Sequence, residues 1–241
     1  MTDPAALFAA FEATWPAAAR ETLGPFTYRN GAGGGSRVSA ATLDGEFNAS
    51  ALKTIETRFA KDGRDALFQI RAGEEAFDAE LAARGYRLFD PVACLIAPLE
   101  AFPAASSESG YACWPPVAIQ REIWAEGGIG PARLAVMDRV PGPKCALLGR
   151  LGDTPAGTGF IAIHEGIAAL HALETSVPHR RQGLARAMMA LAADWARAQG
   201  ANSLALQVTR ANTAALALYS SLGMQEAGQY HYRIKALSEF Q

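Results

Sequence analysis

The 241-residue sequence is short of cysteine and contains no long hydrophobic run. Its three cysteines, Cys94, Cys113 and Cys145, have neither the spacing of a metal site nor an even disulfide framework. We therefore expect reduced thiols and no bound metal. The N-terminal stretch has an early aspartate and no basic start, which argues against a signal peptide or a membrane anchor. We expect a cytoplasmic protein with no membrane partner.

An excess of charge of either sign is also missing. The formal net charge is −2, and only four of the 22 basic residues are lysine. This balance gives no electrostatic footprint for nucleic acid, so no nucleic-acid partner is expected. With 50% hydrophobic and 19% charged residues, the composition is that of a folded globular protein. The length allows one large domain or two small ones.

The spacing of apolar residues predicts the elements of the first half. Helices are expected over 4–19, 50–61 and 73–84, and strands over 26–28, 37–43, 66–71 and 91–97. The glycine-rich loop 30–36 lacks the Gly-Lys-Ser/Thr ending of a P-loop, so we interpret it as a flexible connection. Residues 98–116 are rich in proline, serine and alanine, which predicts a linker.

The second half alternates strands and helices. Its clearest pattern places Leu184, Met188, Leu191 and Trp195 on one face of a helix that Gly200 ends. The alternation predicts an α/β domain (α+β, with a mixed sheet) whose central connections cross over between near-parallel strands. Helices are expected over 117–126, with 132–138 extending that region, and over 183–199 and 212–222; strands are expected over 144–150, 156–163, 167–176, 203–208 and 229–236.

The segment Arg180–Ala185 joins a predicted strand to the amphipathic helix. Free backbone N–H groups at a helix start, reinforced by the helix dipole, favour an anion at that point. Gly183 lets an oxyanion approach the backbone without a Cβ in the way, and Arg180 and Arg181 add positive charge. On this pattern alone, a helix entrance with solvated arginines is an equal alternative.

The motif Arg180-x-x-Gly183-x-Ala185 after a strand resembles the pyrophosphate-binding signature of the Gcn5-related N-acetyltransferases, the GNAT family. The sequence continues in that family's order, with a strand at 204–208, the run Asn212-x-x-Ala215-x-x-Leu218-Tyr219, and then Leu222-Gly223-Met224. The resemblance covers residues 115–241. It implies the GNAT acyl-CoA N-acyltransferase fold, with acetyl-CoA as co-substrate and no metal.

The resemblance also implies which residues contact the cofactor. Leu173 and Thr175 would pair with the pantetheine arm as an added strand does, and the Leu173 amide would polarise the thioester carbonyl. Asn212 would hydrogen-bond near the arm, or act only as a helix N-cap. The pyrophosphate would be bound through the backbone amides of Arg180, Arg181, Gln182, Gly183, Leu184 and Ala185.

A general acid is implied at Tyr219, which would protonate the departing thiolate of CoA. A phenol has an ordinary pKa of about 10, which suits a donor to a thiolate formed in a dry site. The alternative is a core tyrosine, because Ala215, Tyr219 and Leu222 share one helix face.

A general base must take a proton from the acceptor amine. His171 is the first candidate, because an imidazole titrates near neutral pH and because the surrounding segment resembles serotonin N-acetyltransferase. A strand histidine with a structural role is an equal alternative. Many family members carry a glutamate at the position of Ala169. Glu174 is the second candidate, although strand alternation puts it on the opposite face from His171 unless a bulge intervenes.

Residues 26–97 repeat the order of the second half: strands, helix, strand, helix and strand. Setting Gly85 against Gly223, an offset of 138, places Leu81 at the position of Tyr219. The first half has no Arg-x-x-Gly-x-Ala motif, so it should neither bind CoA nor supply the acid. We therefore expect two tandem GNAT-like halves: a degenerate domain over 1–105 without a CoA motif, and an acetyltransferase domain over 106–241.

Together these motifs predict an enzyme that transfers an acetyl group from acetyl-CoA to a primary amine of a small molecule, by direct attack in a ternary complex. Acetylation of a protein or peptide N-terminus is the alternative reaction. A non-catalytic module that binds CoA or a partner protein is the alternative of another class. The intact Tyr219 favours turnover, whereas Ala169 in place of the usual acid weakly favours the binding module. The acceptor, the acyl length and the oligomeric state, monomer or homodimer, stay open.

Overall fold

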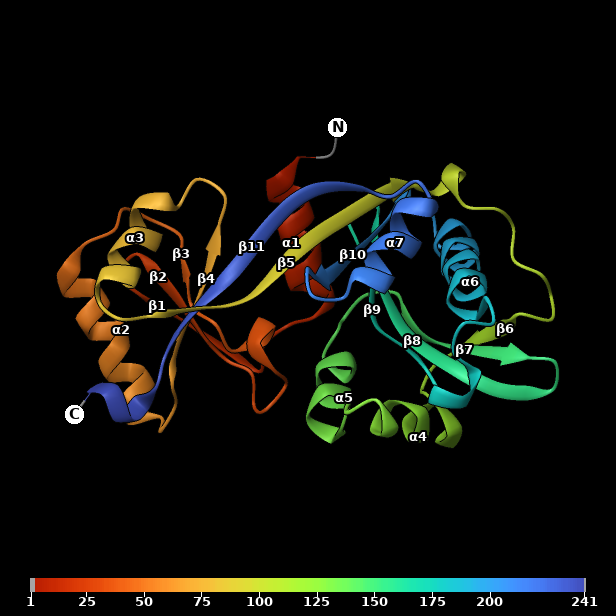
Figure 1. Ribbon diagram of the computed structural model, residues 1–241, viewed down its shortest axis with the longest axis horizontal. Coiled ribbons are helices and arrows are strands. Elements are labelled where there is room, and N and C mark those ends of the chain that lie inside the picture. The colour runs from red at the N-terminus through yellow and green to blue at the C-terminus, as the bar shows by residue number, and fades with distance from the viewer. Residues whose placement is uncertain (1–2, 241) are drawn as a thin grey trace. The chain divides into compact units, whose positions relative to one another are not determined.

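The computed structural model describes residues 3–240, which fold into two compact units (Figure 1). Unit 1 consists of the chain up to Pro16 together with residues 94–208 and 212–227, and unit 2 consists of residues 17–93, 209–211 and 228 onward. The units therefore interleave in sequence, and a single cut between residues 105 and 106 does not separate them. A domain division at that point stays a prediction.

Unit 1 is built on a mixed sheet. Neighbouring strands among β6 (Gly110–Cys113), β7 (Lys144–Leu151), β8 (Thr154–His164) and β9 (Ile167–Thr175) are antiparallel, whereas β10 (Ser203–Thr209) lies parallel to β9. This arrangement confirms the predicted mixed α/β fold. The strand order is the end of β5 (Arg87–Pro98), then β10, β9, β8, β7 and β6.

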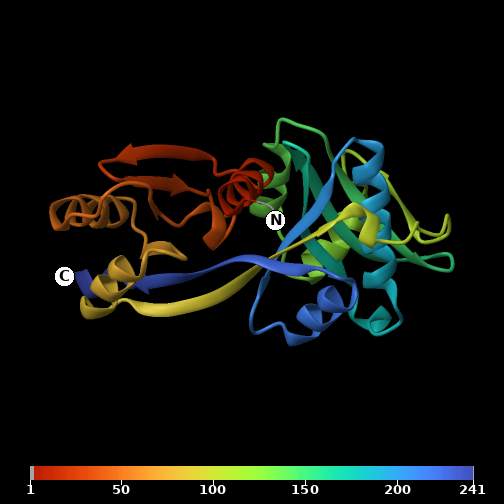
Figure 2. The same ribbon diagram turned by 90° about the horizontal axis from the view of Figure 1, so that it is seen from above.

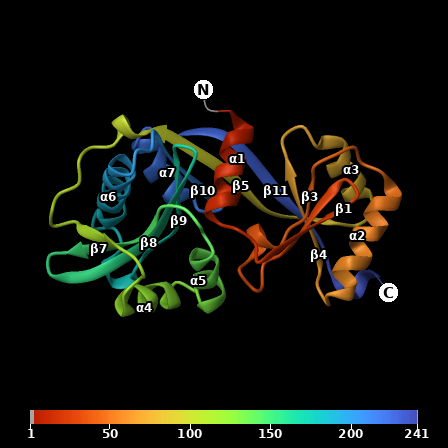
Figure 3. The ribbon, with the colours of Figure 1, turned by 180° about the vertical axis from the view of Figure 1, so that it is seen from behind.

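Helices cover this sheet on both faces (Figure 3). The helix α6 (Leu184–Ala198) packs on β7, β8 and β9, while α1 (Pro4–Thr14) and α4 (Ala118–Glu126) pack on β8 and β9 from the other side. Of the predicted apolar face of α6, Leu184 and Met188 are buried, whereas Leu191 and Trp195 are half-buried. A Cβ added at Gly149 or Gly157 would lie 2.6 or 2.7 Å from the sulfur of Met188, so glycine at these two positions lets α6 approach the sheet closely.

Unit 2 contains a second, three-stranded sheet and an aromatic core. The strands β1 (Ala19–Leu23), β2 (Phe26–Asn30) and β3 (Thr42–Leu43) form the antiparallel sheet. The helix α2 (Ala49–Lys61) buries Leu52, Ile55 and Phe59, the face that the sequence predicts. β4 (Ala66–Arg71), β11 (Gln225–Lys235) and β5 are neighbours in the larger sheet, and Figure 2 shows β11 in blue running beside β5 in yellow.

Four segments differ from the prediction. The helix expected over 4–19 ends at Thr14, ahead of Pro16, which has no N–H to donate, and β1 begins at Ala19. The strand expected over 37–43 is a 3₁₀ turn, Ser36–Val38, followed by the short β3. The supposed linker 98–116 contains β6, and the residues 131–138 form a separate helix, α5, after a run of glycines.

A strand–helix–strand unit occurs twice in the chain. The first copy is β4, α3 (Glu75–Ala83) and β5, and the second is β10, α7 (Thr213–Ser221) and β11. At an offset of 138 both ends of α3 coincide with those of α7. The helix ends also match, because Gly85 and Gly223 have φ of 83° and 80°. The bonds Tyr86 N–H to Leu81 O and Met224 N–H to Tyr219 O recur at 3.0 and 3.1 Å. This repetition supports a tandem arrangement.

The two copies exchange their last strands. β11 of the second copy pairs antiparallel with β4 of the first, from Tyr230↔Arg71 to Lys235↔Ala66. The end of β5, from the first copy, lies next to β10 in unit 1. Each unit therefore contains a strand of the other copy, which is why the units do not follow the halves of the sequence.

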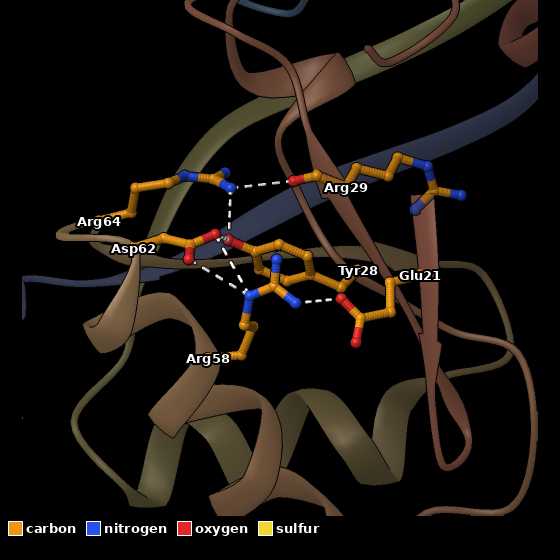
Figure 4. A network of polar contacts seen from close by, with 6 residues as sticks. All are labelled: Glu21, Tyr28, Arg29, Arg58, Asp62 and Arg64. Atoms are coloured by element: carbon orange, nitrogen blue, oxygen red, sulfur yellow. Dashed lines mark hydrogen bonds and ion pairs between the residues drawn. The ribbon is translucent and has the colours of Figure 1, made fainter. Parts of the chain in front are cut away.

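A polar network joins the C-terminal end of α2 to the strands of unit 2 (Figure 4). The Tyr28 hydroxyl donates to Asp62 at 2.8 Å and accepts from Arg64 at 2.7 Å, while Arg58 bonds both Asp62 and Glu21. Burial raises the pKa of Tyr28, and the hydrogen bond from Tyr28 lowers the pKa of the Asp62 carboxyl. These groups satisfy one another, so we assign them a structural role.

Candidate functional site

The strands β9 and β10 pair over only part of their length. Their parallel register runs from Ile167↔Ser203 to Leu170↔Leu206 and stops there, although β9 continues to Thr175 on its other side against β8. Within the described residues, the edge of 172–175 that faces β10 therefore has no partner in β10. Backbone N–H and C=O groups in such an edge can pair with an added extended chain.

A bulge in β9 lies at the point where the strands separate. Thr158 is opposite Glu174 and Phe160 is opposite His171, so two β9 residues, Ala172 and Leu173, face one β8 residue. Ala172 has φ of 50°, in the left-handed region. The extra residue brings Glu174 onto the same face of the sheet as His171. The bulge that is needed for Glu174 and His171 to share a face is therefore present.

His171 is enclosed by side chains of unit 1. It is 3% exposed, and the rings of Trp15 and Phe160 lie 5.0 and 6.2 Å from its ring. Thr14 Oγ1 is 2.9 Å from Nε2 and donates to the Ala10 carbonyl at 2.6 Å. A hydroxyl has one hydrogen, so Nε2 donates to Thr14 and cannot accept a proton there. The geometry favours a structural role for His171.

Glu174 is more accessible than His171 and lies beside a glycine. A Cβ added at Gly127, just after α4, would be 2.5 Å from Oε1 of Glu174, so the carboxylate packs directly on this backbone. Burial raises the pKa of the Glu174 carboxyl, and the nearby Arg180 guanidinium opposes this shift. A half-buried carboxylate with a raised pKa on the open part of β9 can accept a proton.

The loop between β9 and α6 presents backbone amides and arginines. Arg181 and Gly183 have positive φ, 65° and 82°, and Gly183 is the N-cap of α6 without a side-chain cap. The first hydrogen bond of the helix comes from the Ala187 amide to the Gly183 carbonyl, so the preceding amides have no acceptor within the helix. Arg180 is exposed and its Nε donates to the Thr175 carbonyl at 3.1 Å. The loop fits an anion such as a pyrophosphate.

The helix α7 carries the two remaining candidates. Asn212 caps it by accepting a hydrogen bond from the Ala215 amide at 3.1 Å. Tyr219 is 8% exposed, and burial raises its pKa to about 12. The phenol therefore keeps its proton at any physiological pH and can donate it.

Some residues near the bulge escaped the sequence-based reasoning. Trp124 in α4 donates from Nε1 to the Ala172 carbonyl at 2.8 Å, and Gly127 makes room for Glu174. Thr158, opposite Glu174, is fully buried, and its Oγ1 has no hydrogen-bond partner among residues 3–240. No motif in the sequence marks these positions, because their roles depend on the pairing of β8 with β9.

Across residues 3–240 no group of three or more His, Cys, Asp or Glu side chains could hold a metal ion. In the same residues, none of the helices combines the length and apolar character needed to span a bilayer.

Comparisons with known proteins agree with this architecture. Residues 108–224 match the family model described as "Acetyltransferase (GNAT) family". The chain is 24% identical over 240 residues to the uncharacterized N-acetyltransferase YobR of Bacillus subtilis, covering 92% of this chain and 95% of that protein. The solved structure of a GCN5-related N-acetyltransferase from Kribbella flavida is similar, with a TM-score of 0.67, 21% identity and coverage of 96% and 91%. A tandem GNAT protein from the clavulanic acid biosynthesis pathway gives a TM-score of 0.62, 12% identity and coverage of 88% and 78%.

Proposed function

We propose that this protein transfers an acetyl group from acetyl-CoA to a primary amine of a small molecule, and the match of residues 108–224 to the GNAT family model supports this proposal. The observation that carries the proposal is the separation of β9 from β10 at residues 172–175, which lead to the amide-rich start of α6. This arrangement fits a cofactor with an extended amide-containing arm and a pyrophosphate at its end.

The donor would be bound mainly by backbone groups. The amides and side chains of Arg180, Arg181, Gln182, Gly183, Leu184 and Ala185 would hold the pyrophosphate. Leu173 and Thr175 would pair with the pantetheine arm as a strand does. Asn212 already caps α7 with its Oδ1, so its side-chain nitrogen is the group that would reach the arm.

Proton transfers would accompany direct attack of the amine on the thioester. The Leu173 N–H would stabilise the oxyanion as the C–N bond forms. Glu174 would take the proton that the amine nitrogen loses, and Tyr219 would give its proton to the sulfur as the C–S bond breaks. The tyrosine regains a proton from solvent after the thiol leaves. Glu174 is preferred to His171 as the base because its carboxylate is accessible and the Nε2 of His171 is occupied.

Glu174→Gln removes the proton acceptor while keeping the shape of the side chain. We expect turnover to fall about 100-fold near neutral pH. In wild type, kcat should rise with pH as Glu174 ionises, and this acidic limb of the pH profile should be absent in Glu174→Gln. Burial raises this carboxyl pKa from 4.5, so that limb lies above pH 4.5. The measurement is kcat as a function of pH with one acceptor amine.

Glu165→Gln, in the exposed turn that precedes β9, is the matched control and should keep the wild-type profile. Loss of the limb in His171→Gln, with the limb intact in Glu174→Gln, would transfer the base role to His171.

An acceptor screen tests the proposed function itself. The protein is incubated with acetyl-CoA and a panel of small amines and peptides with free N-termini, and CoA release is followed. Release with a small amine and not with peptides is the expected result. Release only with peptides would favour an N-terminal acetyltransferase. Tight binding of acetyl-CoA without release for any amine would favour a non-catalytic module.

A further inference from the structure

Trp124 connects α4 to the bulge in β9. Its side chain is fully buried, and its single polar atom, Nε1, donates to the carbonyl of Ala172 at 2.8 Å. Ala172 is one of the two β9 residues that face a single residue of β8. The extra residue of a bulge is left without a ladder partner, so the indole supplies the bond that the sheet does not.

The conformation held by this bond is unfavourable for alanine. Ala172 has φ of 50°, where the Cβ of an L-residue crowds the backbone. Such a residue keeps its conformation only where its surroundings fix it. The orientation of the next peptide group, the Leu173 N–H, follows directly from the backbone angles of Ala172. A change at Ala172 would therefore turn the amide that would contact the thioester oxygen.

The end of the same helix also sets the place of Glu174. Gly127 follows α4 with φ of −80°, and an added Cβ would lie 2.4 Å from Cγ of Glu174. The Glu174 side chain thus rests on the Gly127 backbone, three residues after Trp124. The C-terminal end of α4 therefore contacts both neighbours of Leu173, namely Ala172 and Glu174.

We infer that Trp124 is a positioning residue, which holds the bulge so that the Leu173 amide and the Glu174 carboxylate keep their reactive places. This inference rests on the proposed function for its kinetic consequence. Trp124 touches neither the donor nor the acceptor in this assignment, and it acts through the Ala172 carbonyl.

The variant Trp124→Phe keeps an aromatic ring in the core and removes the N–H. We expect kcat to fall about 10-fold while KM for acetyl-CoA changes less than about twofold, because the misplaced groups act on the transition state. Trp195→Phe in α6, which packs on the other face of the sheet, is the matched control and should leave kcat unchanged. A kcat of Trp124→Phe equal to wild type would overturn the inference.

Gly127→Ala moves Glu174 without changing either Trp124 or the carboxylate itself. Alanine is allowed at this φ, so the variant should fold and displace the side chain. The pH at which the rate of Gly127→Ala rises should differ from that of wild type. An unchanged pH profile, with kcat as in wild type, would contradict the placement of Glu174 on this helix end.

Hydrogen exchange gives a readout that does not depend on activity. In Trp124→Phe without acetyl-CoA, the amides of residues 171–175 should exchange about fivefold faster than in wild type, in line with the loss of one hydrogen bond. Unchanged exchange would overturn the inference. If wild type released no CoA with any amine but the exchange increased as expected, the proposed function would fail and the role of Trp124 in holding the bulge would stand.

Discussion

Gly183→Asp is expected to abolish acetyl-CoA binding, with a loss of affinity of at least roughly 100-fold. The substitution places a carboxylate at the point where the α6 amides would meet the pyrophosphate. It also forces a residue with a Cβ into a backbone with φ of 82°, which would turn the amides of the loop. No atom lies within 4 Å of a Cβ added at Gly183, so the helix packing itself is left intact. Isothermal titration calorimetry measures the effect.

The other end of α6 provides the control. Gly200 has φ of 80° and also has free space around an added Cβ. Gly200→Asp therefore imposes the same backbone strain and the same charge, away from the proposed pyrophosphate site. We expect this variant to bind acetyl-CoA as wild type does. Equal acetyl-CoA affinity in folded Gly183→Asp and wild type would refute the assignment of the loop.

Tyr219→Phe is expected to lower turnover by roughly 10- to 10,000-fold, the smaller effect applying if water can replace the phenol as donor. The ring and its packing in α7 remain, and only the atom that donates is lost. Acetyl-CoA affinity should change little. The experiment compares kcat with the dissociation constant of acetyl-CoA in the same variant.

The raised pKa of Tyr219 gives a second, independent consequence. A donor is lost when pH rises above its pKa, and burial raises this pKa to about 12. We therefore expect no fall in kcat from this group up to pH 10. Tyr111→Phe, at an exposed tyrosine in β6, should leave turnover unchanged. Wild-type turnover in Tyr219→Phe would show that another group, or solvent, protonates the thiolate.

Local patterns in the sequence were sufficient to predict most of the elements near the site. The face of α6 formed by Leu184 and Met188, the cap at Asn212 and the turn at Gly223 each depend on residues close in sequence. The repeat at an offset of 138 was also predictable, because helix ends with glycine mark the same point in both copies. These features follow from periodicity and capping alone.

The bulge and its supports could not be predicted in the same way. Alternation placed Glu174 away from His171, and only the register of β9 against β8 brings both residues to one face. The hydrogen bond between Trp124 and Ala172 joins residues 48 positions apart, and the hydrogen bond between His171 and Thr14 joins residues 157 positions apart. Non-local pairing of this kind leaves no periodic signal in one sequence.

The interleaving of the two units could not be predicted from the sequence either, because it also depends on long-range strand pairing. Both β5 and β11 have the composition of ordinary strands, and their residues do not predict which strand each will pair with. The pairing of β11 with β4 is one of several possible long-range pairings. It places the end of β11 in unit 2, so the units are not divided at residue 105.

The footprint of acetyl-CoA in hydrogen exchange tests the central proposal most directly, namely that acetyl-CoA binds at the start of α6 and not at the start of α2. In α2, the Asn48 side chain already accepts from the Ala51 amide at 2.8 Å, so that helix start offers a poorer anion site than α6. Saturating acetyl-CoA should slow exchange within 173–185 and 212–219 and leave 49–61 unchanged. Protection at 46–55, or its absence at 173–185, would contradict the account.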